Sequence, residues 1–439
     1  MATETTFWVQ TDGADTNGGT NGTATSGSAS AVVTGTCNTS SGSGNITLIG
    51  SPTLTAVLNN VDCIRIAGAT GGLGSSGDVF QVTVKGDPTL VVTPVVGNAQ
   101  SGVAFAIGGA FQTIQRALNC VDDTGGGWEV QVKTGTYAGA GTRIDLAKQG
   151  TKTNPNLLSA YISSKGDIKK DDYFDDAKRA VADQTSGSGT VLTLNGSLGS
   201  KAFWLVEHLK VNSGDGIGIA VTIGRMVFRN VKSANNGSIG WDVNTGPTTY
   251  DCCEADNNGT VGVDAVAVFF AYNFRSYLND SYGMTMDSYT ALYKCLFYGN
   301  ATIQLECDGV GTEGLLLART TIDGETNTIC VDGPDEEGRG IVVDNYFYDG
   351  SEGLGCNDDP GGKTYAVWSN VFASNTADRV NWQTGEDDVS TAGEALFVDA
   401  ANRNYELQAG ALGIGIGYGG SDAGYESRPA LPRRPVLLG

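Results

Sequence analysis

The sequence predicts an all-β protein whose main part is a right-handed parallel β-helix, a solenoid of short strands. Three observations predict this fold. Glycine accounts for 64 of 439 residues, about twice the usual share of roughly 7%. Short stretches rich in β-branched residues end at Asn, Asp or Gly, which is typical of strands joined by tight turns. A degenerate repeat runs through residues 203–382.

Each repeat opens with an aromatic or aliphatic residue, alternates apolar and polar side chains, and ends at a turn residue. The units begin at Phe228, Tyr250, Tyr272, Tyr293, Leu317, Val343 and Trp368. A period of 21 to 26 residues with several short strands is typical of a solenoid. The Leu and Asn/Cys frame of leucine-rich repeats is absent, and an ordinary antiparallel domain predicts no such recurrence.

Stacked coils place equivalent residues above one another at about 4.8 Å, so inward positions form ladders. The repeat predicts two inward ladders. The first is Phe228, Tyr250, Tyr272 and Tyr293, and the second is Cys252, Phe274 and Cys295.

The N-terminal part predicts a cap for the solenoid. Residues 1–18 are expected to form a capping strand. Apolar residues at helical spacing predict a helix over 110–122, where it can cover the open end of a solenoid running over 107–417. Between them, the Gly/Ser/Thr-rich segment 19–106 contains strand-like runs, which predict a small inserted β subdomain.

Three segments resemble known proteins. Phe7-Trp-Val-Gln-Thr-Asp-Gly-Ala-Asp-Thr-Asn and Gly109-Ala-Phe-Gln-Thr-Ile-Gln-Arg-Ala-Leu are similar to the entry of pectate-lyase-like β-helix proteins. Residues 395–410 resemble that family's last coil. Similar openings occur in phage virion proteins such as tail spikes. The resemblance implies a parallel β-helix and a place in a virus particle, although the 19–106 insertion departs from it.

Bulk properties limit the partners. The formal charge of −21, from 48 acidic and 27 basic residues, argues against binding nucleic acid. The N-terminus lacks the pattern of a secretory signal, and no apolar run could span a bilayer, so we expect synthesis in the host cytoplasm and no membrane partner. The nine scattered cysteines are expected to be small buried hydrophobes rather than disulfides or a metal site.

Acidic groups in long turns are the candidates for catalysis. They are Asp332, Asp335, Glu336 and Glu337 with Arg339, and Asp358 with Asp359. Paired carboxyls could hydrolyse a glycan, and carboxylates with Ca²⁺ and a basic residue could serve a polysaccharide lyase. The alternative is a solvated acidic loop, because Asp and Gly are common in turns. We expect the latter, and no catalytic residue, metal or cofactor.

Other polar and aromatic residues remain open at this stage. Asp256, Asp280 and Asp323 lie at repeat turns, where a structural role is expected, and His208 has no nucleophile motif near it. Some aromatic side chains must lie outside the solenoid, where they could bind a glycan or form a subunit interface. The candidates are Trp241, Tyr272, Tyr277, Tyr282, Tyr289 and Trp382.

The C-terminal segment 418–439 is expected to be an extended tail that attaches the protein to its partner. It carries positive charge on an acidic chain, and its proline content keeps it extended. The expected partner-binding residues are Arg428, Pro429, Pro432, Arg433, Arg434, Pro435 and Leu437. We therefore expect a non-enzymatic structural or decoration protein of a phage-like virion, on the head or a fibre. It would bind other virion proteins and form a homo-oligomer, with a trimer favoured. The alternative is a tail-spike-like protein that binds or degrades a surface glycan.

Overall fold

The computed structural model describes residues 5–20, 26–122, 126–138, 143–184, 189–194, 202–307, 314–325, 328–333, 339–355, 364–380, 385, 387–391, 397–399, 404–407 and 423–424. The chain divides into two compact units. Unit 1 comprises residues 1–183 and 195–210, and unit 2 comprises residues 184–194 and 211–438.

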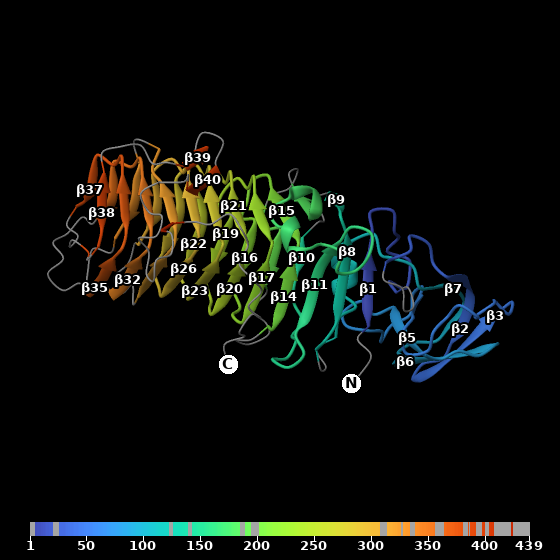
Figure 1. Ribbon diagram of the computed structural model, residues 1–439. Coiled ribbons are helices and arrows are strands. Elements are labelled where there is room, and N and C mark those ends of the chain that lie inside the picture. Colours follow the sequence, from blue (N-terminus) through green and yellow to red (C-terminus); the bar gives the residue numbers. More distant parts are fainter. Residues whose placement is uncertain are drawn as a thin grey trace. The chain divides into compact units, whose positions relative to one another are not determined.

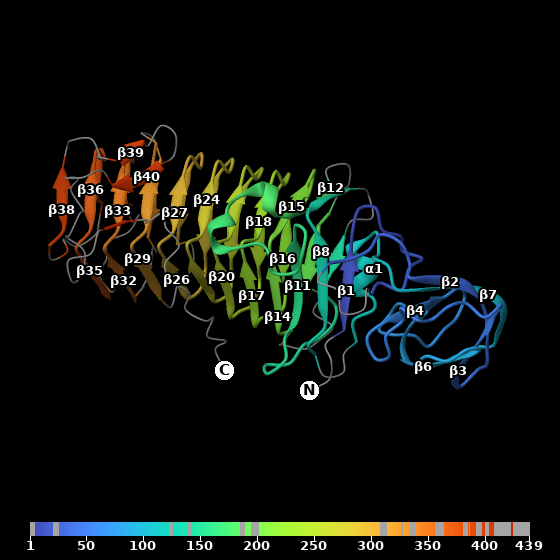
Figure 2. The same ribbon diagram turned by 45° about the vertical axis from the view of Figure 1, so that its right-hand side comes forward.

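Unit 1 contains a closed antiparallel barrel formed by the inserted segment (Figure 2). Its strands, in the order in which they pair, are β2 (Val33–Thr39), β3 (Ser43–Ile49), β6 (Thr89–Val96), β5 (Val79–Val84), β4 (Cys63–Ile66) and β7 (Gln100–Ile107). Alternate apolar residues of these strands fill the barrel, among them Ile46, Phe80 and Ile107, which are fully buried. Closure leaves the barrel without an unpaired edge.

The first parallel strands also belong to unit 1. Strand β1 (Thr6–Val9) pairs with β8 (Glu129–Lys133), which pairs with β11 (Asn156–Tyr161) and then β14 (Trp204–Glu207). Strand β9 (Gly135–Ala138) pairs with β12 (Ala180–Gln184). The remaining elements of this part of the chain are β10 (Ile144–Asp145), the 3₁₀ turns η1 (Lys170–Asp172) and η2 (Asp176–Lys178), and β15 (Leu209–Ser213).

The capping helix is shorter than the sequence predicted. Helix α1 is Ile114–Leu118 instead of 110–122, because Phe111 still pairs with Val9 in extended form. The two sequence motifs that suggested the cap, around Asp15 and Gln112, are separated in the sequence by the inserted barrel but are in contact here. The Asp15 carboxylate accepts the backbone N–H groups of Gln112 and Thr113 at 3.0 and 2.9 Å. Asp15 thereby fixes the segment that leads into the helix.

Unit 2 is a parallel β-helix, so the predicted fold class is confirmed (Figure 1). Each coil contributes one strand to each of three sheets, and every pairing between consecutive coils is parallel. Sheet 1 contains β17 (Met226–Arg229), β20 (Thr248–Asp251), β23 (Phe269–Tyr272), β26 (Thr290–Tyr293), β29 (Leu315–Ala318), β32 (Arg339–Val343) and β35 (Thr364–Trp368).

Sheet 2 contains β18 (Lys232–Ala234), β21 (Glu254–Asp256), β24 (Arg275–Tyr277), β27 (Leu296–Tyr298), β30 (Thr321–Asp323), β33 (Tyr346–Tyr348), β36 (Val371–Ala373) and β38 (Val389–Thr391). Sheet 3 contains β13 (Leu192–Leu194), β16 (Ile219–Val221), β19 (Trp241–Val243), β22 (Val261–Ala265), β25 (Tyr282–Met286), β28 (Ile303–Glu306), β31 (Ile329–Asp332), β34 (Glu352–Gly355) and β37 (Ala377–Arg379).

The corners on either side of sheet 2 keep a fixed spacing. A residue with positive φ ends each sheet 1 strand, and in most described coils a second one follows five residues later. The pairs are Asn230 and Asn235, Cys252 and Asn257, Asn273 and Leu278, Lys294 and Gly299, Asp344 and Asp349, and Ser369 and Ser374. In the remaining coil Arg319 is followed by Glu325. The variation in coil length therefore falls between sheet 2 and the next sheet 1 strand.

The inward ladder of sheet 1 differs from the predicted one by a single residue. Phe228 and Tyr250 face inward as expected, but they are in register with Ala271, then Leu292. Tyr272 is in register with Asp251 and lies half-exposed on the outside, as does Tyr293. Successive residues of a strand point to opposite faces, so the one-residue difference turns both tyrosines outward.

The second predicted ladder is also displaced at one position. Phe274 and Cys295 are buried as expected, but the residue aligned with them is Cys253, because Cys252 forms the corner with φ 56°. The eight cysteines that the structure describes are buried, as the sequence predicted; Cys356 lies outside the described residues.

Buried amides join the coils at the corner that follows sheet 2. Asn236 Nδ2 donates to Asn258 Oδ1 at 2.6 Å, Asn258 Nδ2 donates to Asn279 Oδ1 at 2.7 Å, and Asn279 Nδ2 donates to Asn300 Oδ1 at 2.7 Å. Asn300 donates in turn to Gln304 at 2.6 Å. We call this series the amide ladder. Each amide nitrogen donates to the next side-chain oxygen, as buried polar groups require, and only Asn236 Oδ1, at the first position of the series, accepts no hydrogen bond from the described residues.

The segment that resembled a last coil is not part of the stack. Strands β39 (Phe397–Asp399) and β40 (Asn404–Leu407) form a separate antiparallel pair, which we call the C-terminal hairpin. The expected solenoid boundary at residue 417 is therefore wrong for this segment. Its aromatic side chains Phe397 and Tyr405 pack on the outer side of sheet 2 instead of continuing a parallel ladder.

Candidate interaction surfaces

The outward residues of the three sheets give unit 2 three chemically different surfaces. We call the outer sides of sheets 1, 2 and 3 face 1, face 2 and face 3. Because side chains alternate along a strand, strand register assigns each residue to the interior or to a face. Each face is described in turn.

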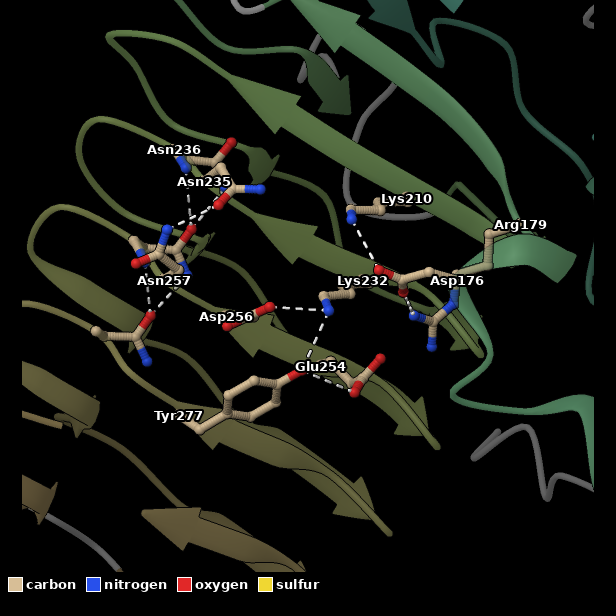
Figure 3. A network of polar contacts seen from close by, with 12 residues as sticks. Asp176, Arg179, Lys210, Lys232, Asn235, Asn236, Glu254, Asp256, Asn257 and Tyr277 are labelled. Carbon is tan, nitrogen blue, oxygen red and sulfur yellow. Dashed lines mark hydrogen bonds and ion pairs between the residues drawn. The ribbon is translucent and has the colours of Figure 1, made fainter. Parts of the chain in front are cut away.

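Face 2 begins with a network of charged residues (Figure 3). Lys232 Nζ lies 2.8 Å from Asp256 Oδ2 and 3.1 Å from the Tyr277 hydroxyl oxygen. The Tyr277 hydroxyl donates to Glu254 Oε1 at 3.2 Å. Burial, and then the neighbouring Glu254 carboxylate, raise the pKa of Tyr277, so the phenol stays protonated as a donor. This lysine is held in a compact ion-paired cluster. Figure 3 also shows an ion-paired group of unit 1, in which Asp176 accepts from Arg179 and Lys210 at 2.8 Å each.

The next part of face 2 is apolar and lies under the C-terminal hairpin. Tyr298, Tyr346 and Val371 of the sheet form one buried cluster with Phe397 and Tyr405 of the hairpin. The backbone continues this contact further along the chain. Ala423 is buried in the same cluster, and the Gly424 N–H donates to the Asp344 carbonyl at 2.7 Å. Residues 423 and 424 of the predicted tail therefore lie against face 2.

One titratable contact lies inside this cluster. The Tyr405 hydroxyl donates to Asp323 Oδ2 at 2.9 Å. Burial raises the pKa of Asp323 from 3.8 to about 6. The Glu325 N–H and the Tyr405 hydroxyl oppose this shift, and the charges of Glu325 and Asp349 add to it. The hairpin contact is thus expected to depend on pH.

The sign of the dependence follows from the raised pKa of Asp323. The folded protein holds the Asp323 proton more tightly than the unfolded chain does. The contribution of this carboxyl to the stability of the folded state is therefore fully present below about pH 4 and is lost as pH rises through about 6. Relative to an Asp323→Asn variant, we expect the melting temperature of the parent to fall by about 2–4 °C across this range. Parallel melting curves of parent and variant at every pH would contradict the assignment.

Face 3 carries a row of carboxylates. Asp242, Asp264, Glu306 and Asp332 follow one another in register, with Thr285 between the second and third. Burial, and then the charge of Asp264, raise the pKa of Asp242. Within the described residues, no three His, Cys, Asp or Glu side chains are placed to hold a metal ion. Face 3 is an acidic strip.

Face 1 carries no carboxylate over five adjacent strands, β23, β26, β29, β32 and β35. The outward pairs in these described strands are Phe270 and Tyr272, Ala291 and Tyr293, Leu316 and Ala318, Ile341 and Val343, and Ala366 and Trp368. The rings of Tyr272 and Tyr293 are stacked, with centroids 5.5 Å apart. Ile341 is 41% exposed, and Tyr289 at the edge is 39% exposed. This is an apolar, aromatic surface.

The sequence-predicted site residues have varied outcomes. Asp332 belongs to the row on face 3, and Asp256 is ion-paired to Lys232. Trp241 is fully buried inside, where its Nε1–H donates to the Glu254 carbonyl, and His208 packs against Tyr173 with ring centroids 5.4 Å apart. The residues that lie outside the described residues are Asp335, Glu336, Glu337, Asp358, Asp359, Trp382, Arg428, Pro429, Pro432, Arg433, Arg434, Pro435 and Leu437.

Unit 1 has a hollow of about 430 Å³ beside helix α1. Its described lining includes Thr113, Tyr137 and Arg143, and contains no carboxylate, histidine or cysteine. The Tyr137 hydroxyl donates to the Lys133 carbonyl at 2.8 Å. The described lining thus offers hydroxyls, amides and one cation.

In the described part of the chain, none of the helices has the length and apolar character needed to cross a membrane.

Comparison with known proteins gives matches in structure alone. No family model and no curated protein sequence matches the chain. Pectate lyase Pel9A is similar to it with a TM-score of 0.44 and 15% identity, covering 73% of this chain and 92% of its own. The pectin methylesterase from Aspergillus niger is similar with a TM-score of 0.36 and 10% identity, covering 69% of this chain and 88% of its own. The GH136 lacto-N-biosidase from Eubacterium ramulus is similar with a TM-score of 0.32 and 11% identity, covering 65% of this chain and 64% of its own.

Proposed function

We propose that this protein is a non-enzymatic structural or decoration protein of a phage-like virion, made in the host cytoplasm and exposed on the particle surface. The observation that carries the proposal is the amide ladder. Polar side chains such as Asn258 and Asn279 are buried, and their hydrogen bonds join successive coils. Buried hydrogen-bonded networks of this kind make a core rigid and specific, as a structural component requires.

The charged network on face 2 supports the same proposal. A lyase base must give and take a proton, but the Lys232 ammonium lies between Asp256 and the Tyr277 hydroxyl, and this tyrosine keeps its proton. The Tyr277 ring and the Lys232 chain are both buried. This arrangement suits cohesion between strands β18, β21 and β24 better than turnover of a polymer.

Attachment to the particle is assigned to the C-terminal tail. The Gly424 N–H donates to the Asp344 carbonyl, so the chain is held to the protein at this residue. The arginines at 428, 433 and 434 can pair with carboxylates of another virion protein. The proline-rich sequence lowers the entropy cost of ordering the tail on that surface.

A truncated protein that ends at residue 425 tests this role. It keeps Ala423 and Gly424 on face 2 and removes the arginines and prolines that follow. We expect it to fold with the parental melting temperature and to lose incorporation into particles at least about tenfold. The matched variant replaces Arg428, Arg433 and Arg434 by Ala in the full chain. Parental incorporation of both proteins would show that the tail is not the anchor.

Face 1 favours a second candidate, a glycan-binding or glycan-degrading tail-spike-like protein. Half-exposed aromatic residues such as Tyr272, Tyr293 and Trp368 present flat apolar surfaces on which sugars could stack. Incubation of the parent with bacterial surface polysaccharide, followed by an assay for new reducing ends or unsaturated sugars, separates the two candidates. The proposal predicts no cleavage. Cleavage by the parent that is lost on replacing Asp335 and Glu336 by Ala would overturn it in favour of an enzyme.

A further inference from the structure

We infer that face 1 of unit 2 is a self-association surface, and that its occupant is the same face of another copy of this chain. The inference does not depend on the virion assignment. It starts from the composition of the face. Phe270, Tyr272, Tyr293, Leu316, Ile341 and Trp368 all point outward from consecutive strands of one sheet.

The face is large enough, and apolar enough, to require cover. Five strands at about 4.8 Å spacing give it a length of about 19 Å along the stack. Ile341 is 41% exposed, and Leu316, which is paired with it, and Phe270, further along the same face, are half-buried. A contiguous apolar surface of this kind marks an interaction site, whereas isolated exposed apolar residues do not.

Charge identifies the occupant. The chain carries −21, so two copies repel one another wherever their acidic surfaces approach. The outward residues from Phe270 to Trp368 in sheet 1 include no Asp or Glu, so face 1 lets two acidic copies meet without bringing carboxylates together. A surface complementary to a cationic partner would instead show carboxylates.

The border of face 1 has the character of an interface rim. At one end Arg229 Nε lies 3.1 Å from Asp251 Oδ2, so this pair is neutral. Along the corner with sheet 2, Arg319 lies 3.7 Å from Asp344, and its guanidinium is 6.0 Å from the Tyr293 ring centroid. An apolar and aromatic centre with paired charges and arginine around it is the usual anatomy of a protein–protein interface.

The other two faces are poorer candidates for contact between copies. Face 3 would set the carboxylates of Asp242, Asp264 and Glu306 against their equivalents, which is unfavourable. Much of face 2 is already buried by the chain's own Phe397 and Tyr405. Face 1 is thus the surface of unit 2 on which a second copy fits.

The full-length protein and three variants test the inference by analytical ultracentrifugation at micromolar concentration. Leu316→Glu with Ile341→Glu places two carboxylates on directly paired residues of face 1. Ile341→Ser is a milder change at the most exposed of these positions. The control, Thr260→Glu with Ser281→Glu, adds the same charge to adjacent coils at the turn that precedes sheet 3, where Ser281 N–H donates to the Thr260 carbonyl.

We expect the parent and the control to be oligomers, the double variant to be a monomer, and Ile341→Ser to associate at least about tenfold more weakly. The circular dichroism spectra of all variants should match that of the parent, because the replaced side chains lie outside the core. A monomeric parent overturns the inference. So does an oligomer of parental mass in the folded double variant. A monomeric parent that binds polysaccharide through Tyr272 and Tyr293 would assign face 1 to a glycan instead.

Discussion

Replacing Phe274 with Asp is expected to lower the free energy of unfolding by about 4 kcal/mol or more, because it places an unpaired charge in the core. Phe274 is fully buried, and its ring centroid lies 5.8 Å from Phe269, 6.2 Å from Tyr250 and 6.4 Å from Trp241. No cation is among these neighbours. Equilibrium unfolding in urea measures the loss.

Tyr272→Asp is the matched control. Tyr272 lies two residues earlier in the same coil and is also aromatic, but it points outward on face 1. We expect its replacement to cost about 1 kcal/mol or less in the monomer. If the two variants lose equal stability, the register of sheet 1 described here is wrong.

The second large effect is expected in the amide ladder. Asn258→Asp removes the Nδ2 donor that bonds Asn279 and puts a carboxylate at a fully buried position. The Asn279 acceptor loses its side-chain partner, and the new charge has no cation beside it in the ladder. We expect a loss of about 3 kcal/mol.

The adjacent residue provides the control for this prediction. Asn257 is exposed at the corner, where its amide donates to Asn235 Oδ1 at 2.7 Å outside the core. Its φ is 51°, a conformation that Asp tolerates nearly as well as Asn. Asn257→Asp should therefore cost only a few tenths of a kcal/mol. Thermal melts that rank Asn257→Asp below Asn258→Asp in stability would contradict the ladder.

The sequence was sufficient for the fold because a β-helix repeats its signal. Strand, turn and strand recur in every coil, so alternation and the Asn, Asp and Gly turn residues were visible several times over. The helix and the Asp15 motif were also visible, although 19–106 separates them. Their contact, in which Asp15 accepts the N–H groups of Gln112 and Thr113, needed the structure.

Register was the part that sequence reasoning could not fix. Aligning the units by their aromatic residues matched Tyr250 with Tyr272, whereas the strands match Tyr250 with Ala271. Ala and Tyr differ greatly in size, yet both can occupy an inward position, so side-chain identity does not mark the phase. The positive-φ corners do mark it. Asn230, Asn273 and Asp344 are residue types that favour this conformation, but Lys294 and Arg319 are not.

The faces were predictable only in part. Exposed aromatics were expected, but the assignment of Trp241 to the outside was open, and it is buried. The carboxylate row on face 3 was missed, although Trp241-Asp-Val and Val263-Asp-Ala repeat the same pattern. The C-terminal hairpin was mistaken for a coil because its strands have the same alternation. Only tertiary contacts show Tyr405 against Asp323.

The fixed spacing of the corners determines where this protein can accept inserted residues. From a sheet 1 strand through sheet 2, most described coils use the same number of residues, as from Asn230 to Asn235 and from Ser369 to Ser374. An insertion within a sheet 2 strand would shift its side chains out of register with the coils on either side. The connections from sheet 3 back to sheet 1 differ most in length, and they enter the strands that carry face 1. New sequence, whether arising in evolution or grafted as an epitope, can therefore be displayed beside face 1 while the rungs beneath it stay aligned.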